Sequence, residues 1–410
     1  MQKIDGGITA PKGFSVSSCA AGIKYKDRED MILIRSEELC TCGGVFTSNV
    51  VKAAPVIWDR DIISEGKGVR AVVVNSGIAN ACTGQEGLDI CSATASAAAG
   101  ALGIGEKEVL VGSTGVIGMQ LPMDRIRSGI EKMAGTLDVS RESANKAVRA
   151  IMTTDTVPKE SAYTFDLYGT TATIAGMCKG SGMIHPNMCT MLAFMATDAA
   201  IEKELLQKAV REIADESFNM ISVDGDTSTN DTFVVMANGM SGAPAITAED
   251  EGYKAFYEAL RAVCLELARM MAGDGEGATR RIEMTVSGMD TLEHARILAR
   301  SVICSSLTKA AVFGADANFG RILCALGYAG VDFDPNAVKL YFENADDPSD
   351  KMLIYNDGDP VPFDEEKATE LLKKPVVLIH AVFAAGSCEA TAFGCDLTYD
   401  YVTINADYRS

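Results

Sequence analysis

Histidine is scarce in this sequence, which has only three in 410 residues: His185, His294 and His380. There is no H-E-x-x-H motif, and no histidine stands with cysteines at the spacing of a zinc site. The twelve cysteines are scattered, form no C-x-x-C pair and often lie in apolar runs, so we interpret them as buried free thiols. The sequence therefore offers few residues that could bind a catalytic zinc or form a Ser-His-Asp triad, and we expect no metal.

Basic residues and long apolar runs are also few. Lys and Arg number 37 against 56 Asp and Glu, a formal net charge of -19, and this disfavours nucleic acid because phosphates are bound through clustered Lys and Arg. No apolar run approaches the roughly 20 residues that span a bilayer, and the beginning, MQKIDGGITAPKGF, lacks the pattern of a signal peptide. We therefore expect a cytoplasmic protein without nucleic-acid or membrane partners.

The composition favours an α/β protein with more than one core. Aromatic residues make up only 6% of the chain, hydrophobic residues make up 47%, and glycine and alanine are plentiful. This balance suits closely packed layers of helix and sheet. The length predicts roughly two or three domain-sized units.

Strands followed by polar loops recur in the first half of the chain. The β-branched segment 69–75, VRAVVVN, predicts a buried strand that ends in the loop SGIANACTG, and EVLVGSTGVIG at 108–118 predicts a second such unit. Alternating residues at 161–177 predict a hairpin that turns at Tyr168-Gly169. Helices are expected over 85–103, near 122–134 and over 139–151.

A second α/β unit is predicted downstream. Residues 221–239 read as strand, polar loop and strand, 250–275 as a long amphipathic helix, and 290–306 as another helix, followed by a loop at 314–321. The acidic loop Asp224–Asp231 echoes a calcium loop but lacks the glutamate at position twelve, so we assign it no metal. We expect its carboxylates and hydroxyls to cap helix ends and to order the interior beside the active site.

The segment Asn187–Leu192 is a short polar hinge that opens a nearly uncharged strand, and it follows the glycine-rich KGSGMIHP. Taken alone, Thr190 in this hinge would more often be a packing or edge residue of the strand. Its functional interpretation depends on a resemblance.

The stretch KGSGMIHPNMCTMLAFMATDA resembles the signature of the ornithine acetyltransferase family, also called glutamate N-acetyltransferase. The resemblance covers essentially the whole chain, because further motifs follow in the family's order: NSGIANACTG, VGSTGVIG, MTTDTVPK, DGDTSTNDT, DGEGATR, GADANFGR and CDLTYDYVTINADYRS. It implies a layered α-β-β-α sandwich of the DmpA or N-terminal-nucleophile type, with a smaller C-terminal α/β unit from about residue 280.

The resemblance also implies that the chain cleaves itself between Cys189 and Thr190, which leaves an α chain of residues 1–189 and a β chain of residues 190–410. Cleavage would supply the base that a threonine hydroxyl needs, because a new α-amino group with a pKa of about 8 is substantially neutral at working pH. In the precursor, the hydroxyl would attack the preceding carbonyl in an N-to-O acyl shift that water then resolves.

The family's site residues map onto eight positions of this sequence. Thr190 would be the nucleophile, and Thr114 with Gly115 would form the oxyanion hole. The substrate-binding residues would be Thr156, Lys179, Thr190, Glu276, Asn405 and Ser410. Without the resemblance, Lys179 and Glu276 would more often be solvated charges, Thr156 a helix-end cap and Ser410 a frayed terminus.

The implied activity is ping-pong acetyl transfer from N-acetylornithine to glutamate through an acetyl-threonine intermediate, in cyclic arginine biosynthesis. No cofactor is implied, although acetyl-CoA is accepted as a donor by some members, and two α and two β chains would form a heterotetramer. The rival enzyme is a self-processing amidase or aminopeptidase of the same fold. A phosphate-binding module is disfavoured because no G-x-x-x-x-G-K-[ST] is present and no G-x-G-x-x-G follows a strand.

Departures from the family pattern are modest: Cys189 for alanine, Ile78 for asparagine, Arg280 for lysine, and Ala317 and Phe319 in a loop that often reads DPNWGR. The Cys189 thiol could compete as a nucleophile, but the acyl shift uses the residue after the bond. His185 precedes a proline and lies across the cleaved bond from Thr190, so we interpret it as structural.

Overall fold

The computed structural model describes residues 1–185 and 191–406, and the chain divides into two compact units. The first unit contains residues 1–180, 191–219 and 227–267, and the second contains residues 181–185, 220–226 and 268–406. The first unit therefore continues beyond the predicted cleavage bond, which itself lies outside the described residues.

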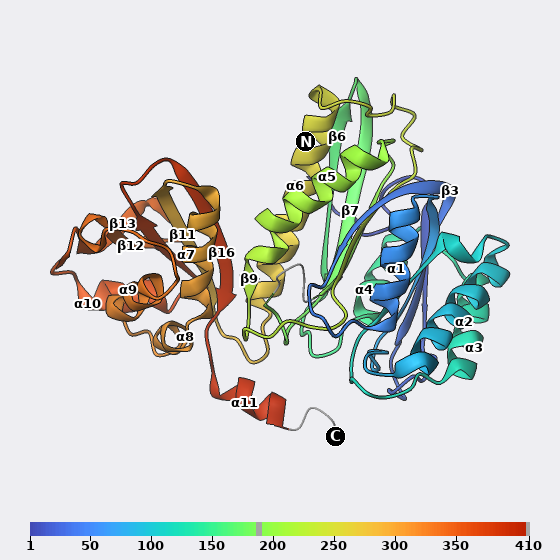
Figure 1. Cartoon of the computed structure of the whole chain (residues 1–410), viewed down its shortest axis with the longest axis horizontal. Helices are drawn as coiled ribbons and strands as arrows, with labels where there is room; N and C mark the ends of the chain where they lie inside the picture. The colour runs from blue at the N-terminus through green and yellow to red at the C-terminus, as the bar shows by residue number, and fades with distance from the viewer. Residues whose placement is uncertain (186–190, 407–410) are drawn as a thin grey trace. The chain divides into compact units, whose positions relative to one another are not determined.

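The first unit is built on a nine-stranded sheet (Figure 1). Its order is β1 (Gln2–Ile4), β6 (Lys159–Leu167), β7 (Thr170–Lys179), β8 (Leu192–Thr197), β10 (Thr232–Ala237), β3 (Met31–Phe46), β4 (Val69–Asn75) and β5 (Val109–Ser113), with β2 (Phe14–Cys19) beside β3. The 16-residue strand β3 joins two parts of this sheet, because residues 31–36 pair with β2 and residues 41–46 pair with β10.

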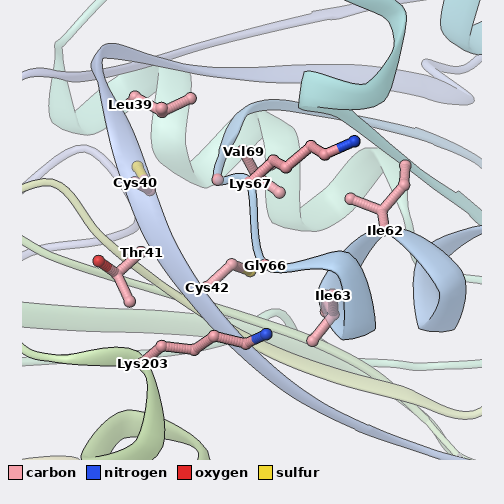
Figure 2. A pocket seen from close by; sticks show the side chains of 11 residues that line it. Leu39, Cys40, Thr41, Cys42, Ile62, Ile63, Gly66, Lys67, Val69 and Lys203 are labelled. Carbon is pink, nitrogen blue, oxygen red and sulfur yellow. The ribbon is translucent and has the colours of Figure 1, made fainter.

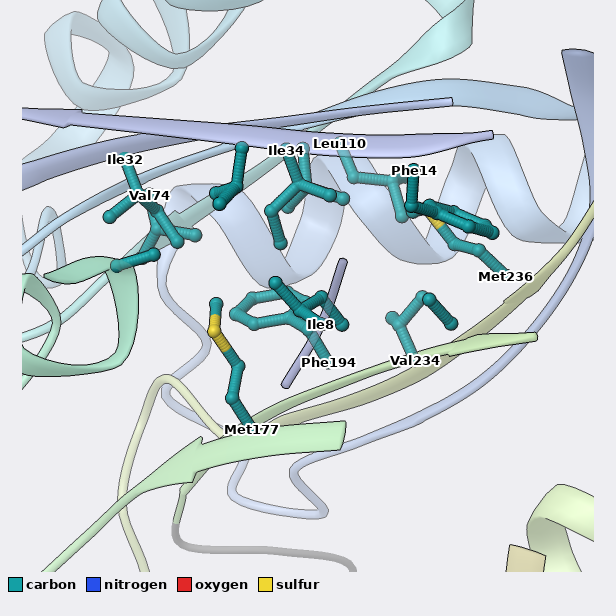
Figure 3. Packing of buried hydrophobic residues seen from close by; sticks show 14 of the residues in the cluster. Ile8, Phe14, Ile32, Ile34, Val74, Leu110, Met177, Phe194, Val234 and Met236 are labelled. Atoms are coloured by element: carbon teal, nitrogen blue, oxygen red, sulfur yellow. The ribbon is translucent and has the colours of Figure 1, made fainter. Parts of the chain in front are cut away.

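The two parts of the sheet face each other across the main hydrophobic core. Figure 3 shows side chains of β3, β4 and β5, such as Ile34 and Leu110, directed toward Met177 of β7, Phe194 of β8 and Val234 of β10. All five are at most 2% exposed. Because burial of each such side chain is worth about 1.5–3 kcal/mol, the contact between the two layers is a main source of stability.

Helices cover both outer faces. Helices α2 (Gly84–Leu102) and α3 (Met123–Ala134) pack on the β3–β4–β5 face, and α1 (Ala54–Glu65) contacts β5. Helix α5 (Lys203–Glu216) covers β3 and β10, while α6 (Glu251–Gly273) packs on β6 and β7, where the Phe165 and Phe256 rings lie 6.4 Å apart. Helix α4 (Arg141–Ala150) contributes to the core between the layers. The predicted α-β-β-α layering is therefore confirmed in this unit.

The second unit contains a seven-stranded sheet. Its order is β14 (Asp359–Pro360), β13 (Asp347–Asn356), β12 (Lys339–Asn344), β15 (Val376–Val382), β11 (Arg281–Met289), β16 (Cys388–Cys395) and β9 (Ile221–Ser222). Helix α7 (Leu292–Cys304) packs on β11 and β16. The remaining helices of this unit are α8 (Ser306–Phe313), α9 (Phe319–Gly327), α10 (Glu365–Leu372) and α11 (Tyr399–Ala406), and a short 3₁₀ turn occupies Pro335–Ala337. Two further 3₁₀ turns occupy Glu106–Glu108 in the first unit and Phe218–Met220 at the boundary between the two units in the sequence.

The predicted hairpin is confirmed, because β6 and β7 pair in antiparallel register up to Leu167 and Thr170. The strands predicted within 221–239 also form, but β9 joins the sheet of the second unit and β10 that of the first. Helix α9 begins at Phe319, inside the predicted loop 314–321, because the Asn318 side chain accepts the Arg321 N–H and caps the helix. None of the described helices is long and apolar enough to cross a membrane.

The interpretation of the cysteines as buried thiols is wrong at four described positions. Cys82 and Cys324 are exposed, and Cys304 and Cys388 are partly exposed. Cys82 lies in the loop before α2 with a φ of 56°, and Cys324 lies on the solvent side of the short helix α9. The other seven described thiols are buried, and none of the eleven described cysteines is in a disulfide.

Candidate active site

The loop after β5 carries Thr114 and Gly115 and is paired with the loop after β4. The Thr114 N–H donates to the carbonyl of Asn75 at 3.0 Å, and the Val116 N–H donates to the carbonyl of Gly77 at 3.0 Å. Because β4 and β5 are parallel neighbours, both loops leave the same edge of the sheet. Their pairing fixes the backbone at the predicted oxyanion hole.

Gly115 is required by this pairing. Its φ is 128°, and a β-carbon there would overlap the carbonyl of Gly77 and lie 2.7 Å from its Cα. Within the described residues, neither the Thr114 hydroxyl nor the Gly115 N–H forms a hydrogen bond. These are two uncharged donors on a fixed backbone, which is what an oxyanion hole needs.

Buried asparagines hold the same loop from two sides. The Asn230 amide donates to the carbonyls of Ser113 at 2.9 Å and Ala79 at 2.5 Å. The Ser113 hydroxyl donates to the Asn75 side chain at 2.7 Å, and the Asn75 amide donates to the carbonyl of Ile78 at 2.8 Å. The polar loop before β10 is thereby attached to the predicted oxyanion hole.

The start of β8 lies between two other strands of the site. Leu192, its first residue, is paired with Lys179 of β7 on one side and with Thr232 of β10 on the other. The Thr232 N–H also donates to the carbonyl of Met191 at 2.8 Å. Thr190 and Cys189 lie outside the described residues, but Thr190 directly precedes Met191 in the sequence. The strand that follows the predicted nucleophile is therefore fixed beside Lys179.

Lys179 belongs to a buried ionic cluster. Its ammonium group donates to the Thr153 hydroxyl at 2.8 Å and lies 3.7 Å from Asp155 Oδ2. Asp155 Oδ1 accepts from Lys159 at 2.8 Å and from the Gly180 N–H at 2.6 Å. Both Asp155 and Lys159 have fully buried side chains. The ammonium group of Lys179 is thus held at the end of β7 by polar and charged partners, and it is not a solvated surface charge.

The charges of these lysines control the protonation of Asp155. Burial would raise the pKa of the Asp155 carboxyl, but the charges of Lys179 and Lys159 and the hydrogen bonds from Lys159 and the Gly180 N–H outweigh it and hold the pKa well below its usual range. The carboxyl therefore stays ionised at working pH. Thr156, the next residue, is exposed on the same loop.

In the second unit, Glu276 and Asn405 are brought together. The Asn405 amide of α11 donates to Glu276 Oε2 at 2.7 Å, and Glu276 is 6% exposed. The Glu276 N–H donates to the carbonyl of Ser181 at 3.0 Å. A β-carbon at Gly182 would overlap the Glu276 carboxylate, so the glycine of the signature permits this approach. A carboxylate and an amide are thus held together as two predicted substrate ligands.

The segment before the predicted cleavage bond is held by Asp224 and His185. Asp224 accepts the Met183 and Ile184 N–H groups at 2.6 and 2.8 Å, so it orders this segment and does not cap a helix as expected. His185 is hydrogen bonded to Ser222 at 3.1 Å and to Arg300 at 3.1 Å. Burial and the Arg300 charge lower the pKa of His185, which fits the structural role expected for it.

The predicted site residues thus divide between the units. Thr114, Gly115, Thr156 and Lys179 lie in the first unit, Glu276 and Asn405 in the second, and Thr190 and Ser410 outside the described residues. Sequence reasoning did not single out Asp155 or Asn230. Asp155 stands in the motif MTTDTVPK directly before Thr156, and this position was the available signal. Asn230 stands in the motif DGDTSTNDT, in which no residue had been assigned to the site.

A separate pocket of about 160 Å³ lies beside β3 and the end of α1 (Figure 2). Leu39, Thr41, Ile62 and Val69 line it together with Lys203, whose ammonium group donates to the carbonyl of Ser64 at 3.1 Å. None of the described site residues lines this pocket, so it is not the predicted substrate site.

Comparisons with known proteins agree with the motifs. A sequence profile described as the ArgJ family matches residues 15–410. A protein of Symbiobacterium thermophilum called arginine biosynthesis bifunctional protein ArgJ is 50% identical over the whole of both chains, and its namesake from Caldanaerobacter subterraneus is 48% identical, again over both whole chains. A crystal structure of arginine biosynthesis bifunctional protein argJ from Bacillus halodurans is 42% identical, covering 52% of this chain and 98% of that chain with a TM-score of 0.49.

Proposed function

The chain belongs to the ArgJ family, and from this premise we propose that it is a self-processing acetyltransferase that moves the acetyl group of N-acetylornithine to glutamate. Thr190 carries the acetyl group between the two half-reactions. The enzyme thereby recycles the acetyl group within arginine biosynthesis, in keeping with the name of its relatives.

One observation in the first unit supports this proposal most strongly. The start of β8, two residues after Thr190 in the sequence, is paired with Lys179. The adjacent strand β10 follows Asn230, whose amide donates to the carbonyl of Ser113, next to Thr114. The strand that follows Thr190 in the sequence, a cation and two neutral hydrogen-bond donors are therefore connected through the hydrogen bonds of the sheet and its loops. Acyl transfer through a tetrahedral intermediate uses this combination of groups.

The first half-reaction starts with the Thr190 hydroxyl and its own α-amino group. The amine takes the hydroxyl proton as Oγ attacks the acetyl carbonyl of N-acetylornithine. The Thr114 hydroxyl and the Gly115 N–H stabilise the oxyanion. When the intermediate collapses, the proton passes to the leaving nitrogen, ornithine departs and acetyl-Thr190 remains. Glutamate then attacks the ester through its neutral amine and leaves as N-acetylglutamate.

Substrate recognition needs charges of both signs, because ornithine and glutamate carry carboxylates and ammonium groups. Lys179 supplies the positive charge and Glu276 the negative one, with Thr156, Asn405 and Ser410 as neutral partners. The buried contacts of Lys179 and Glu276 support this role over that of surface charges.

The finer features of the family are also part of the proposal. Cleavage between Cys189 and Thr190 makes the α and β chains, two of each form a heterotetramer, and the enzyme works in the cytoplasm. Acetyl-CoA serves as an additional acetyl donor, which the word bifunctional in the relatives' name supports. The reaction needs no cofactor.

An isotope-transfer assay tests the proposal. The purified enzyme receives N-acetylornithine labelled in the acetyl group together with glutamate, and labelled N-acetylglutamate and free acetate are both measured. We expect label in N-acetylglutamate, parallel lines in double-reciprocal plots and no transfer by Thr190→Ala. Release of labelled acetate alone would identify an amidase instead, because water would then be the acceptor.

A further inference from the structure

The cluster beneath Lys179 contains a carboxylate to which no role has been assigned. Asp155 is buried, and its two oxygens accept four contacts with different parts of the chain. Oδ1 accepts from the Lys159 ammonium at 2.8 Å and from the Gly180 N–H at 2.6 Å. Oδ2 accepts from the Thr153 N–H at 3.1 Å and lies 3.7 Å from the Lys179 ammonium.

These contacts connect the two segments that carry predicted substrate ligands. Asp155 directly precedes Thr156 in the loop between α4 and β6, while Gly180 directly follows Lys179 at the end of β7. The carboxylate therefore sets the position of the loop relative to the strand. It also forms an ion pair with the Lys179 ammonium, which donates a hydrogen bond to the Thr153 hydroxyl of the same loop.

We propose that Asp155 is a positioning residue that fixes the Lys179 ammonium and the Thr156 loop in the geometry that receives the substrate. Lys159 gives Asp155 a fully buried ion-pair partner at 2.8 Å, while Lys179 stays at 3.7 Å and keeps 9% of its side chain exposed. The closer lysine is therefore the structural partner of Asp155, and Lys179 is the one left in reach of a substrate carboxylate. The expected effect on KM rests on the proposed function, whereas the expected effect on the position of the Lys179 ammonium does not.

The variant Asp155→Asn tests the geometry specifically. An asparagine oxygen can still accept from Lys159 and Gly180, whereas its amide group would face the Thr153 N–H and the Lys179 ammonium, two donors. We expect the KM for N-acetylornithine to rise about 10-fold, the usual scale for a lost hydrogen bond to a charged group, with a much smaller change in kcat.

A double-mutant cycle separates positioning from general stability. If Asp155 acts through Lys179, adding Asp155→Asn to Lys179→Met will raise KM only slightly above that of Lys179→Met alone. Thr153→Val is a milder second variant, because it removes only the hydroxyl that accepts from Lys179 and should fold where Asp155→Asn does not. Asp198→Asn is the matched control: this buried carboxylate of the same unit accepts the Lys12 and Thr173 N–H groups and contacts none of the described site residues.

Reductive methylation of lysines with formaldehyde, read by peptide mass spectrometry, tests the placement without any activity assay. We expect Lys179 to react severalfold faster in Asp155→Asn and in Thr153→Val, relative to Lys67, whose side chain is 76% exposed in the first unit. Asp198→Asn should leave that ratio unchanged. An unchanged Lys179 rate in both variants, or a KM effect that adds in full to that of Lys179→Met, would overturn the positioning role. If Lys179 is methylated faster in the variants but the wild-type enzyme transfers no acetyl group, the positioning role is supported and the proposed function is wrong.

Discussion

Gly115 and Gly77 approach each other so closely that a β-carbon on Gly115 would overlap the carbonyl of Gly77. The contact joins the loops after β4 and β5, and it gives the Gly115 N–H its direction. Two residues far apart in the sequence thereby determine the shape of the predicted oxyanion hole.

Gly115→Ala is expected to destabilise the first unit and to inactivate the enzyme. The substitution combines a φ of 128° with backbone overlap, so we expect a loss of about 2–3 kcal/mol in the free energy of unfolding. Displacement of the loop should lower kcat about 100-fold. Urea denaturation and steady-state kinetics measure the two effects. Gly118→Ala is the control, since Gly118 has a φ of 81° but a β-carbon added there would meet no atom within 4 Å.

Thr114→Val should remove one oxyanion donor without changing the shape of the loop. We expect kcat to fall about 100- to 1,000-fold with little change in KM, because the hydroxyl binds charge that develops only in the transition state. Thr114→Ser keeps the hydroxyl and should retain most of the activity. Equal losses in the two variants would contradict a specific role of the hydroxyl, because the serine variant keeps the hydroxyl and loses only the methyl group.

Because the Asp59 carboxyl is buried, we expect its contribution to the free energy of unfolding to fall as the pH rises. Burial raises the pKa of this carboxyl well above its ordinary value; Oδ1 accepts the Val111 N–H at 2.8 Å, while Oδ2 has no hydrogen-bond partner among the described residues. The contribution of Asp59 to the free energy of unfolding is complete below the pKa of about 4 that the carboxyl has in the unfolded chain. This contribution is lost as the pH rises through the higher pKa that the carboxyl has in the folded protein. Urea denaturation between pH 4 and pH 9 should therefore show Asp59→Asn gaining stability relative to the wild type as pH rises. A constant difference across this range would contradict the prediction.

For Asp155 we expect the opposite pH dependence, so that its contribution to the free energy of unfolding falls as the pH falls. Its folded pKa is lowered, against burial, by the charges of Lys179 and Lys159, so its contribution is present above the unfolded pKa of about 4 and is lost as pH falls toward the folded pKa. The stability advantage of the wild type over Asp155→Asn should shrink below pH 4. Denaturation curves at pH 3 and pH 7 measure it, and an advantage that persists undiminished at pH 3 would refute the ionic account of the cluster.

The elements that the sequence predicted well are those determined by local patterns. The hairpin at Tyr168-Gly169 follows from strand alternation around a turn, and the strand at 69–75 follows from its β-branched residues. The assignment of β9 and β10 to different sheets could not be predicted, because it depends on partners far away in the sequence. The motifs predicted Thr114 and Lys179 as site residues. For the same reason, the hydrogen bond of Asn230 next to Thr114 and the ion pair of Asp155 with Lys179 became visible only in the fold.

The central claim is that Thr190 is freed by cleavage and carries the acetyl group, and denaturing intact-mass spectrometry tests it most directly. The wild type should give two chains that divide between Cys189 and Thr190, while Thr190→Ala should give one uncut chain. With N-acetylornithine alone, the β chain should gain the mass of one acetyl group and lose it when glutamate is added. A single uncut chain in a fully active preparation, or an acetyl group on another residue, would contradict the account.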